Sequence, residues 1–552
     1  MKKQTFLFSS TILILSALAA KLTGAIFRIP LANMLGGTGM GYFSSAYSIF
    51  MTVYAVSVTG LPAAVAKLTA EKSALQRYSD LRRVKSSALL FFSAAGLAFT
   101  AVTMLLAYPF CRFSGGGMAA MPAVLAIAPS VFFSCVTSVY RGYYEGLRNM
   151  FPTAVSQIIE GLVKLCSGLA LCLLVLKNPH KFESFFVYFR DTEDPLLPIA
   201  AAAAVMGVTL SSAAGTLFLI LRDKISGDGI SREELSSTEK DIDSRRNIIS
   251  ALLKTAVPIA VGALVTNLTS LIDLVTIMRS LSSAAEKYPG FFAEISGNIP
   301  TAEIPNFLFG SFTGLAVTIF NLVPSCTNMF GKGILPAVSE AFAARDHKQV
   351  RLSTEKAMFA TALVSFPSAV GICVLSGEIL GTLFPTKPLE TEICTFSLSI
   401  LGIAVAFLCM SSTVFAILQA AGRPDLPVKL MLAGVAVKLA GNLLLVRIPQ
   451  LNIAGAAIST LVCYTVICLP AIDAAVKLTN ADISYLKGIF CKICYCSVMC
   501  GGSALLARNM LAEVLNPLPL LIISIFCGVI IYILTALLLG IITKNTLNLL
   551  IS

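Results

Sequence analysis

The chain of 552 residues contains no tryptophan and only two histidines, and charged residues make up only 13% of it. A soluble globular protein carries about 25% charged residues, so this composition excludes a soluble enzyme and a disordered chain. Hydrophobic residues make up 56% and stand in runs of about 20 or more, long enough to cross roughly 30 Å of hydrocarbon as helices. The runs do not alternate with polar residues, which excludes a transmembrane β-barrel.

Acidic residues are scarce, with 29 against 41 basic residues and a formal net charge of +12. Most basic residues flank the apolar runs, which is typical of membrane topology signals, so we expect no nucleic-acid partner. The 15 cysteines lie mostly inside apolar runs, where cysteine packs as a small hydrophobe, and no disulfide framework is predicted. Cys491 and Cys494 have metal-ligand spacing, but His180 and His347 are remote in the sequence, and no metal site is predicted.

The apolar runs predict an all-α polytopic membrane protein with fourteen transmembrane helices. The first run is longer than the core of a cleavable signal, which has about 7–15 residues, so we expect an uncleaved first span. With the N-terminus inside, the inner connections hold 24 Lys and Arg and the outer ones 9. This bias predicts a cell-membrane protein with both termini in the cytoplasm. The expected helices cover residues 6–34, 42–70, 85–110, 118–140, 153–176, 196–221, 251–280, 307–331, 355–376, 391–418, 428–446, 452–474, 486–507 and 516–542.

The two halves of the sequence are related by an internal repeat. The tripeptide LPA at 61–63 recurs 274 positions later at 335–337, and the pair KL at 164–165 recurs at 438–439 with the same offset. Each repeat has six helices, so the second copy enters the membrane in the same orientation, as in transporters built from parallel repeats. The predicted parts are an N-terminal six-helix lobe at 1–222, a cytoplasmic linker at 223–250, a C-terminal six-helix lobe at 251–475 and an added helix pair, helices 13 and 14, at 476–552.

Ionisable groups inside membrane spans are candidate functional residues, because each costs at least about 2.5–3.5 kcal/mol to insert. Lys21 and Arg28 lie seven residues apart on one face of the first helix, where they either line a cavity or snorkel toward an interface. Gln157, Glu160 and Lys164 share one face of the fifth helix. Glu160 and Lys164 are spaced i,i+4, so they either neutralise each other or line the same cavity.

The second half offers further polar positions, and Asp273 is a lone acid in the seventh helix. We expect Asp273 to pair with a basic residue of the first helix or to bind a coupling cation. Lys438 lies in the eleventh helix. A polar stripe follows one face of the eighth helix, where it indicates a hydrated cavity or, alternatively, interhelical hydrogen bonding. The stripe consists of Asn321, Ser325, Asn328 and Lys332.

Cations outnumber acids among these candidates by five to two. A basic cavity of low dielectric attracts an anion, and Arg in particular matches the geometry of phosphate. We therefore predict a substrate with phosphate or carboxylate groups. The cations are Lys21, Arg28, Lys164, Lys332 and Lys438, and the acids are Glu160 and Asp273.

Motifs of nucleotide binding and of catalysis are weak. The glycine-rich segment 36–41 follows no strand and has no P-loop Lys and Ser/Thr, so it indicates a tight turn between helices. No loop offers paired carboxylates, and two remote histidines exclude an evident Ser/His/Asp set. We predict a protein that is not an enzyme, binds no cofactor and hydrolyses no ATP.

Three stretches carry a family resemblance: GLPAAVAK at 60–67, YRGYYEGLRNM at 140–150 with PTAVSQIIE at 152–160, and LPAVSEA at 335–341. With them the chain resembles the multidrug/oligosaccharidyl-lipid/polysaccharide exporter superfamily. Within it, the chain is similar to the polysaccharide-biosynthesis and stage V sporulation protein B-like flippases, which are related to the lipid II flippases. The resemblance spans nearly the whole chain.

The resemblance implies two six-helix lobes around a central cavity that opens to either side in turn. It implies a lipid flippase that moves an undecaprenyl-pyrophosphate-linked saccharide, such as lipid II or a related wall or polysaccharide precursor, from the inner to the outer leaflet. Lys21 and Arg28 fall near basic residues of the first helix that contribute to the cavity in lipid II flippases. The expected partners are this lipid-linked saccharide, membrane lipids and a coupling cation.

Two other functions fit the sequence. One is a cation-coupled multidrug antiporter of the same fold, which should depend on membrane-embedded acids. The other is a non-transporting membrane scaffold for wall synthesis, which needs no polar stripe inside its helices. The scarcity of acids disfavours the first and the polar stripes disfavour the second.

Overall fold

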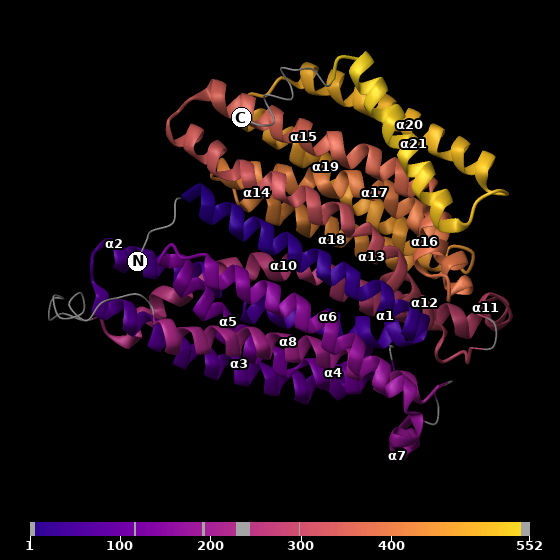
Figure 1. Ribbon diagram of the computed structural model, residues 1–552, viewed down its shortest axis with the longest axis horizontal. Coiled ribbons are helices and arrows are strands. Elements are labelled where there is room, and N and C mark those ends of the chain that lie inside the picture. Colours follow the sequence, from indigo (N-terminus) through magenta and orange to yellow (C-terminus); the bar gives the residue numbers. More distant parts are fainter. Residues whose placement is uncertain are drawn as a thin grey trace. The chain divides into compact units, whose positions relative to one another are not determined.

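The structure is a computed structural model, and it describes residues 6–114, 117–189, 192, 194–227, 243–296 and 299–541. Every regular element in these ranges is a helix (Figure 1). By the packing of its backbone, the chain divides into two compact units, Met1–Met278 and Arg279–Ser552. The lobe and linker boundaries expected from the sequence stay a prediction.

Within its described residues the chain has twelve helical segments long and apolar enough to cross a membrane. One of these segments, Ala19–Ala74, covers the expected span 42–70 and the later part of the expected span 6–34. The long helix α1 (Phe6–Ser57) breaks between them at Gly36, whose φ of 63° and ψ of −171° are not helical. The expected tight turn at 36–41 is therefore a single break at a residue without a Cβ atom, which tolerates this conformation.

The expected span 307–331 is interrupted for a different reason. The π-helical turn η4 (Phe312–Ala316) divides it, and its apolar first part, Ile304–Phe320, is shorter than a full span. The twelve segments confirm an all-helical, multi-pass architecture. The number of fourteen spans stays a prediction.

The first unit is an antiparallel bundle in which proline repeatedly occupies the first helical turn, where its missing N–H costs nothing. Figure 1 shows α3, α5, α6 and α8 running alongside one another. Its helices after α1 are α2 (Leu61–Ala74), α3 (Tyr78–Ser114), η1 (Met118–Ala120), α4 (Met121–Ile127), α5 (Pro129–Gly146), α6 (Phe151–Lys177), η2 (Pro179–Phe182), α7 (Glu183–Phe186), η3 (Val187–Phe189), α8 (Leu196–Ser226) and most of α10 (Arg245–Lys287).

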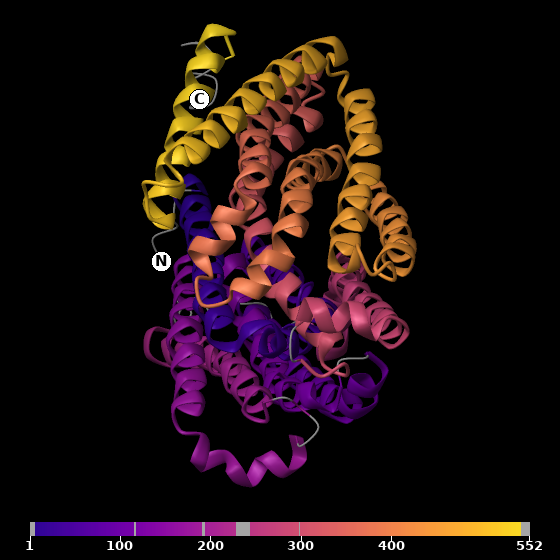
Figure 2. The same ribbon diagram turned by 90° about the vertical axis from the view of Figure 1, so that its right-hand side faces the viewer.

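The second unit has the same kind of architecture. Its last two helices, yellow in Figures 1 and 2, pack on one another. After the end of α10, its helices are α11 (Pro289–Ser296), α12 (Ile304–Ser311), η4, α13 (Val317–Phe320), α14 (Leu322–Ala343), α15 (His347–Val374), α16 (Ser376–Leu383), α17 (Pro388–Ala420), α18 (Asp425–Leu445), α19 (Asn452–Thr479), α20 (Ile483–Leu511) and α21 (Pro517–Leu538).

Helix α10 belongs mainly to the first unit, although its sequence was expected to open the second lobe. Ile248, Leu252 and Ala256 are buried in a cluster with residues of α2, α3 and α5. The carbonyl oxygen of Ala256 lies so close to Gly60 that a Cβ atom on this glycine would be 2.2 Å from it. The first half of α10 is thus fixed to the first unit by packing, and the unit boundary falls later in the same helix.

Backbone geometry supports the internal repeat found in the sequence. Arg148 follows α5 with φ 58°, and Gly422, 274 positions later, follows α17 with φ 76°. Each residue ends its helix in the left-handed conformation and donates its N–H to the carbonyl oxygen three residues earlier, Glu145 and Gln419 respectively. The two units therefore repeat the same helix-ending turn at the offset of the sequence repeat.

Close packing of α6 on α8 depends on two glycines. A Cβ atom on Gly207 would lie 2.4 Å from the Cα of Gly168, which no real pair of atoms tolerates. Small residues let membrane helices approach this closely, and dispersion between the backbones then stabilises the pair. This approach brings the polar faces of the two helices together.

We expect Gly207→Ala to destabilise the protein, because the added methyl group forces α6 and α8 apart at the cost of overpacking, about 1–3 kcal/mol. The measurement is thermal unfolding of the purified protein in detergent. Gly502→Ala in α20 is the matched control, since a Cβ atom there meets no atom within 4 Å. Equal unfolding temperatures for the two variants would contradict this account of the α6–α8 contact.

Candidate functional site

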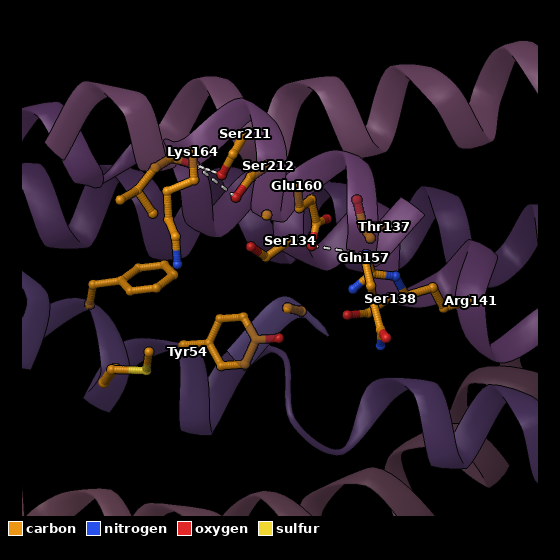
Figure 3. Close-up of a pocket in the computed structure, with 15 residues that line it drawn as sticks. Tyr54, Ser134, Thr137, Ser138, Arg141, Gln157, Glu160, Lys164, Ser211 and Ser212 are labelled. Atoms are coloured by element: carbon orange, nitrogen blue, oxygen red, sulfur yellow. Dashed lines mark hydrogen bonds and ion pairs between the residues drawn. The ribbon is translucent and has the colours of Figure 1, made fainter. Parts of the chain in front are cut away.

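A cavity of about 200 Å³ in the first unit is lined by residues of α1, α5, α6 and α8 and is open on one side (Figure 3). Most of its lining side chains are polar, although the helices that carry them are apolar overall. Burying such groups in a membrane protein is costly unless they meet partners or water. The lining residues are Ala20, Phe50, Met51, Tyr54, Ser134, Thr137, Ser138, Arg141, Gln157, Glu160, Gly161, Lys164, Val208, Ser211 and Ser212.

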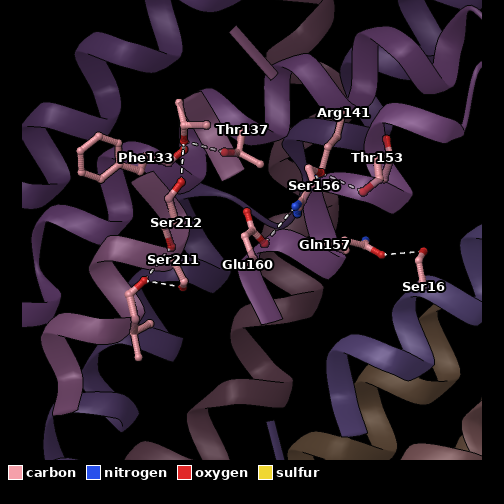
Figure 4. A network of polar contacts seen from close by, with 12 residues as sticks. Ser16, Phe133, Thr137, Arg141, Thr153, Ser156, Gln157, Glu160, Ser211 and Ser212 are labelled. Atoms are coloured by element: carbon pink, nitrogen blue, oxygen red, sulfur yellow. Dashed lines mark hydrogen bonds and ion pairs between the residues drawn. The ribbon is translucent and has the colours of Figure 1, made fainter. Parts of the chain in front are cut away.

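The charged centre of the cavity is an ion pair between α5 and α6. Arg141 Nη2 lies 2.9 Å from Glu160 Oε2, and both side chains are largely buried, with 14% and 26% exposed. Arg141 also donates its Nε–H to Ser156 Oγ at 2.9 Å, and this hydroxyl donates to the carbonyl oxygen of Thr153 at 2.8 Å (Figure 4). The guanidinium is therefore held in one position by two neighbours on α6.

Helix α8 leaves room for the Glu160 carboxylate by carrying glycine at position 215. A Cβ atom on Gly215 would lie 2.5 Å from Glu160 Oε1 and 2.7 Å from its Cγ. The carboxylate therefore occupies the space that a side chain on α8 would take.

Lys164 lies one helical turn after Glu160 on α6 and reaches into the cavity on the other side of Glu160 from Arg141 (Figure 3). Its Nζ lies 5.9 Å from the centre of the Phe27 ring, a weak cation–π contact. Among the ion pairs found in the described residues, Glu160 is joined to Arg141 and none includes Lys164. The i,i+4 neutralisation considered from the sequence is thus replaced by a pair between two helices.

Arg28 of α1 contributes a further positive charge near the cavity. Its guanidinium carbon lies 5.2 Å from the centre of the Tyr47 ring, and the preceding residue, Phe27, contacts Lys164. The side chain of Arg28 is half-buried, whereas Lys21 is exposed. Neither belongs to the lining residues of the cavity, although Ala20 does.

The hydroxyl and amide groups of the wall are mostly hydrogen-bonded to protein. Gln157 accepts a hydrogen bond from Ser16 of α1 at 3.0 Å, and Thr137 of α5 shares one with Thr216 of α8 at 2.7 Å (Figure 4). Ser211 and Ser212 donate to the carbonyl oxygen of Val208 in their own helix, as Figure 4 shows. A hydroxyl that donates to its own helix keeps acceptor capacity toward the cavity.

The remaining predicted residues lie elsewhere. Asp273 is half-buried on α10, outside the lining of this cavity. On and before α14, Asn321 donates to Val317 O at 2.9 Å and Ser325 donates to Asn321 O at 2.7 Å. Lys438 is buried in α18, with 6% exposed. The side chains of Asn328 and Lys332 lie outside the described part of the structure.

Sequence reasoning missed Arg141 as a site residue. The predicted helix ended at residue 140, which placed Arg141 in a connection, whereas α5 continues to Gly146. The signal was present, because Val136, Tyr140, Tyr143 and Tyr144 are spaced as one buried helical face. Because this face continues to Tyr144, the helix extends past residue 140 and includes Arg141.

No group of three or more His, Cys, Asp or Glu in the described chain is placed to hold a metal ion. Cys491 and Cys494, the pair with metal-ligand spacing, are both exposed on α20 with free thiols.

Repeated apolar spans around a polar, charged cavity define a multi-pass membrane protein of the transporter class. The chain belongs to the polysaccharide biosynthesis protein family, whose model matches residues 6–342. A second model, described as lipid II flippase MurJ, matches residues 305–538. The resemblance expected from the three sequence stretches is thereby confirmed.

Two relatives from Bacillus subtilis (strain 168) match most of the chain. The stage V sporulation protein B is 24% identical over 83% of this chain and 81% of its own length. The lipid II flippase MurJ is 22% identical over 82% of this chain and 79% of its own length. Where the name of one of these similar proteins states an activity, that activity is lipid flipping or transport. The chain is therefore similar to transport proteins and not to enzymes.

Solved structures show the same fold. A lipid II flippase MurJ in an inward closed conformation matches with a TM-score of 0.62 at 16% identity, covering 95% of this chain and 98% of that one. An inward-facing multidrug resistance transporter of the MATE family and MOP superfamily matches with a TM-score of 0.59 at 13% identity, covering 85% and 95%. At these identities the similarity shows the fold and does not identify the transported substrate.

Proposed function

We propose that this protein is a flippase that moves an undecaprenyl-pyrophosphate-linked saccharide, lipid II or a related wall or polysaccharide precursor, from the inner to the outer leaflet by alternating access. One observation carries the proposal. The cavity of the first unit holds two cations, Arg141 and Lys164, and one acid, Glu160, which is already paired with Arg141. The excess positive charge favours an anionic head group.

Arg28 strengthens this preference, because it adds a third cation, one residue after Phe27, whose ring contacts Lys164. A pyrophosphate between such groups accepts charge-assisted hydrogen bonds, which are about twice as strong as neutral ones. The hydroxyls of Ser134, Ser138 and Ser211 offer hydrogen bonds to sugar or peptide. The polyprenyl tail remains in the lipid, so only the polar cap needs a hydrated path.

The remaining predicted residues take subsidiary roles in this proposal. Lys21 attracts the anionic head group toward α1. Asp273 binds a coupling cation. The polar groups of the second unit, namely Asn321, Ser325, Asn328, Lys332 and Lys438, bind the saccharide. With both termini cytoplasmic, the inside-negative potential favours outward movement of an anion by about 2.3 kcal/mol per charge per 100 mV.

The test is leaflet accessibility of fluorescent lipid II in vesicles that hold the purified protein. We expect equilibration between leaflets to be much faster than in protein-free vesicles. Lipid that stays in one leaflet, under an imposed potential and with Na⁺ or a proton gradient supplied in turn, would contradict the proposed function.

The role of the first helix gives a separate prediction. We expect Lys21→Ala with Arg28→Ala to slow flipping about tenfold, because one lost charge-assisted hydrogen bond costs about 1.5–3 kcal/mol. The measurement is the initial rate in the same vesicles. Arg112→Ala, at the exposed end of α3, is the control. If the double variant flips at the wild-type rate, the head group does not meet these residues.

A further inference from the structure

Two ion-pair clusters of the same design occur in the chain, one in each unit. In the first, Arg77 Nη2 lies 2.6 Å from Asp80 and 3.2 Å from Asp243. In the second, Arg351 lies 2.9 Å from Glu355 and 3.2 Å from Asp482. Arg77 and Arg351 are 274 positions apart, the offset of the sequence repeat. We name these groups the first latch (Arg77, Asp80, Asp243) and the second latch (Arg351, Glu355, Asp482).

The backbone contacts of the two latches also match. The N–H of Asp243 donates to Asp80 Oδ1 at 3.0 Å, and the N–H of Asp482 donates to Glu355 Oε1 at 2.8 Å. In each case the accepting carboxylate is almost fully buried, with 2% of Asp80 and 10% of Glu355 exposed. One buried acid thus holds both an arginine and the backbone of a distant aspartate.

Each distant aspartate stands directly before a long helix. Asp243 precedes α10 by two residues, and Asp482 precedes α20 by one. Asp482 also caps α20, since its carboxylate accepts from the N–H groups of Ser484 and Tyr485 at 2.9 and 3.2 Å. An acid at this position is further stabilised by the positive end of the helix dipole.

The helices behind the latches are both buried against other helices of their own clusters. The first half of α10 is buried against α2, α3 and α5. Helix α20 is buried through Leu486, Ile493 and Cys496 against α15, α17 and α19. Helices α10 and α20 are thus each buried against the unit that carries the corresponding latch.

We propose that Asp243 and Asp482 are equivalent positioning residues, each fastening the start of a long helix to the corner before α3 or α15 so that helix and corner move as one body. Helix α10 begins in the first unit, ends in the second and contains Pro258. If the latch fixes the start of α10, the helix bends only at residues that follow its first turns. The inference goes beyond the proposed function and holds for any cargo.

Within the residues that the structure describes, the first latch contains an ion pair that the second lacks. Lys72, with 7% of its side chain exposed, makes a further ion pair with Asp243, whereas the position 274 residues later is Asp346. The hydrogen bond from Lys72, together with Arg77, holds the pKa of Asp243 below its usual value. The N–H groups of Tyr485 and Ser484, with Arg351, lower the pKa of Asp482.

The test is hydrogen exchange of the full-length protein in nanodiscs, read at the first turns of α10 and α20. We expect Asp243→Ala to raise exchange at the start of α10 about tenfold, in line with the loss of one charged hydrogen bond, and to leave α20 unchanged. Asp482→Ala should do the reverse. Asp243→Glu should restore most of the protection. Asp473→Ala, which breaks an exposed ion pair with Lys477 in α19, is the matched control.

The flipping rate gives a second measurement, which the loss of a purely structural contact would not change. For Asp243→Ala we expect a lower maximal flipping rate with an unchanged half-saturating lipid concentration. Because both folded pKa values are lowered, the latches stabilise the protein above about pH 4 and lose this effect only as the pH falls below it, so the variant-to-wild-type ratio should be constant from pH 5 to 8. Unchanged exchange at α10 in Asp243→Ala would overturn the inference. Absent flipping in the wild type contradicts only the proposed function.

Discussion

Replacing Lys164 with methionine is expected to reduce lipid flipping by about 10- to 100-fold. Methionine keeps the apolar stem of the side chain and removes its charge, and with it the weak cation–π contact with Phe27. A charge-assisted hydrogen bond is worth about 1.5–3 kcal/mol, and each 1.4 kcal/mol corresponds to about tenfold in rate. The effect should be large because Glu160, the nearby acid, is engaged by Arg141, which leaves the ammonium of Lys164 for the cargo.

The measurement is the initial flipping rate of fluorescent lipid II at a concentration below saturation. Lys164→Arg keeps the charge and should retain most of the activity. Lys177→Met removes a lysine from the exposed end of the same helix and should have no effect. Wild-type rates for Lys164→Met would show that this cation takes no part in binding the head group.

The second large effect is expected at the ion pair between Arg141 and Glu160. Breaking a buried pair by removing one partner typically costs about 3–5 kcal/mol, because the other charge is left behind. Both side chains are partly exposed to the cavity, so each single replacement by alanine should cost about 3 kcal/mol, near the lower limit. The double variant should be more stable than either single variant.

Lipid binding should distinguish the roles of Arg141 and Glu160, whereas the loss of stability is expected to be similar for both variants. Removing Glu160 releases Arg141 and should tighten the binding of undecaprenyl pyrophosphate, whereas removing Arg141 should weaken it. Thermal unfolding and lipid binding of the four proteins in the cycle give both quantities. Asp473→Ala serves as a control for the loss of an exposed acid. Equal weakening of binding by both single variants would mean that the pair is only a structural contact.

Much of the architecture could be predicted from the sequence because a membrane leaves a chain few choices. Backbone groups in hydrocarbon must bond within their own helix, so long apolar runs such as 196–221 and 391–418 predict α8 and α17 with little ambiguity. The glycine-rich segment 36–41 predicted an interruption, which the structure places at Gly36. The π-turn at Phe312–Ala316 was not predicted, because it depends on local backbone conformation, to which hydrophobic patterns are insensitive.

The candidate site could be predicted only in part, and the reason is again physical. Gln157, Glu160 and Lys164 share a helical face, and a shared face is readable from spacing. The ion pair of Glu160 could not be predicted in this way, because Arg141 lies on another helix. Gly215, which leaves room for the Glu160 carboxylate, lies on a third helix. Spacing along one helix indicates which residues point the same way, whereas contacts between helices depend on packing.

The central claim is that the cavity selects an anionic lipid, and a two-cargo experiment tests it most directly. Vesicles holding the purified protein receive either fluorescent lipid II or the cationic dye ethidium, and transport of each is followed with wild type and with Lys164→Met. The account predicts that the wild type flips the lipid, that Lys164→Met loses this activity, and that neither protein transports ethidium. Transport of ethidium without movement of the lipid would contradict it and identify a multidrug antiporter.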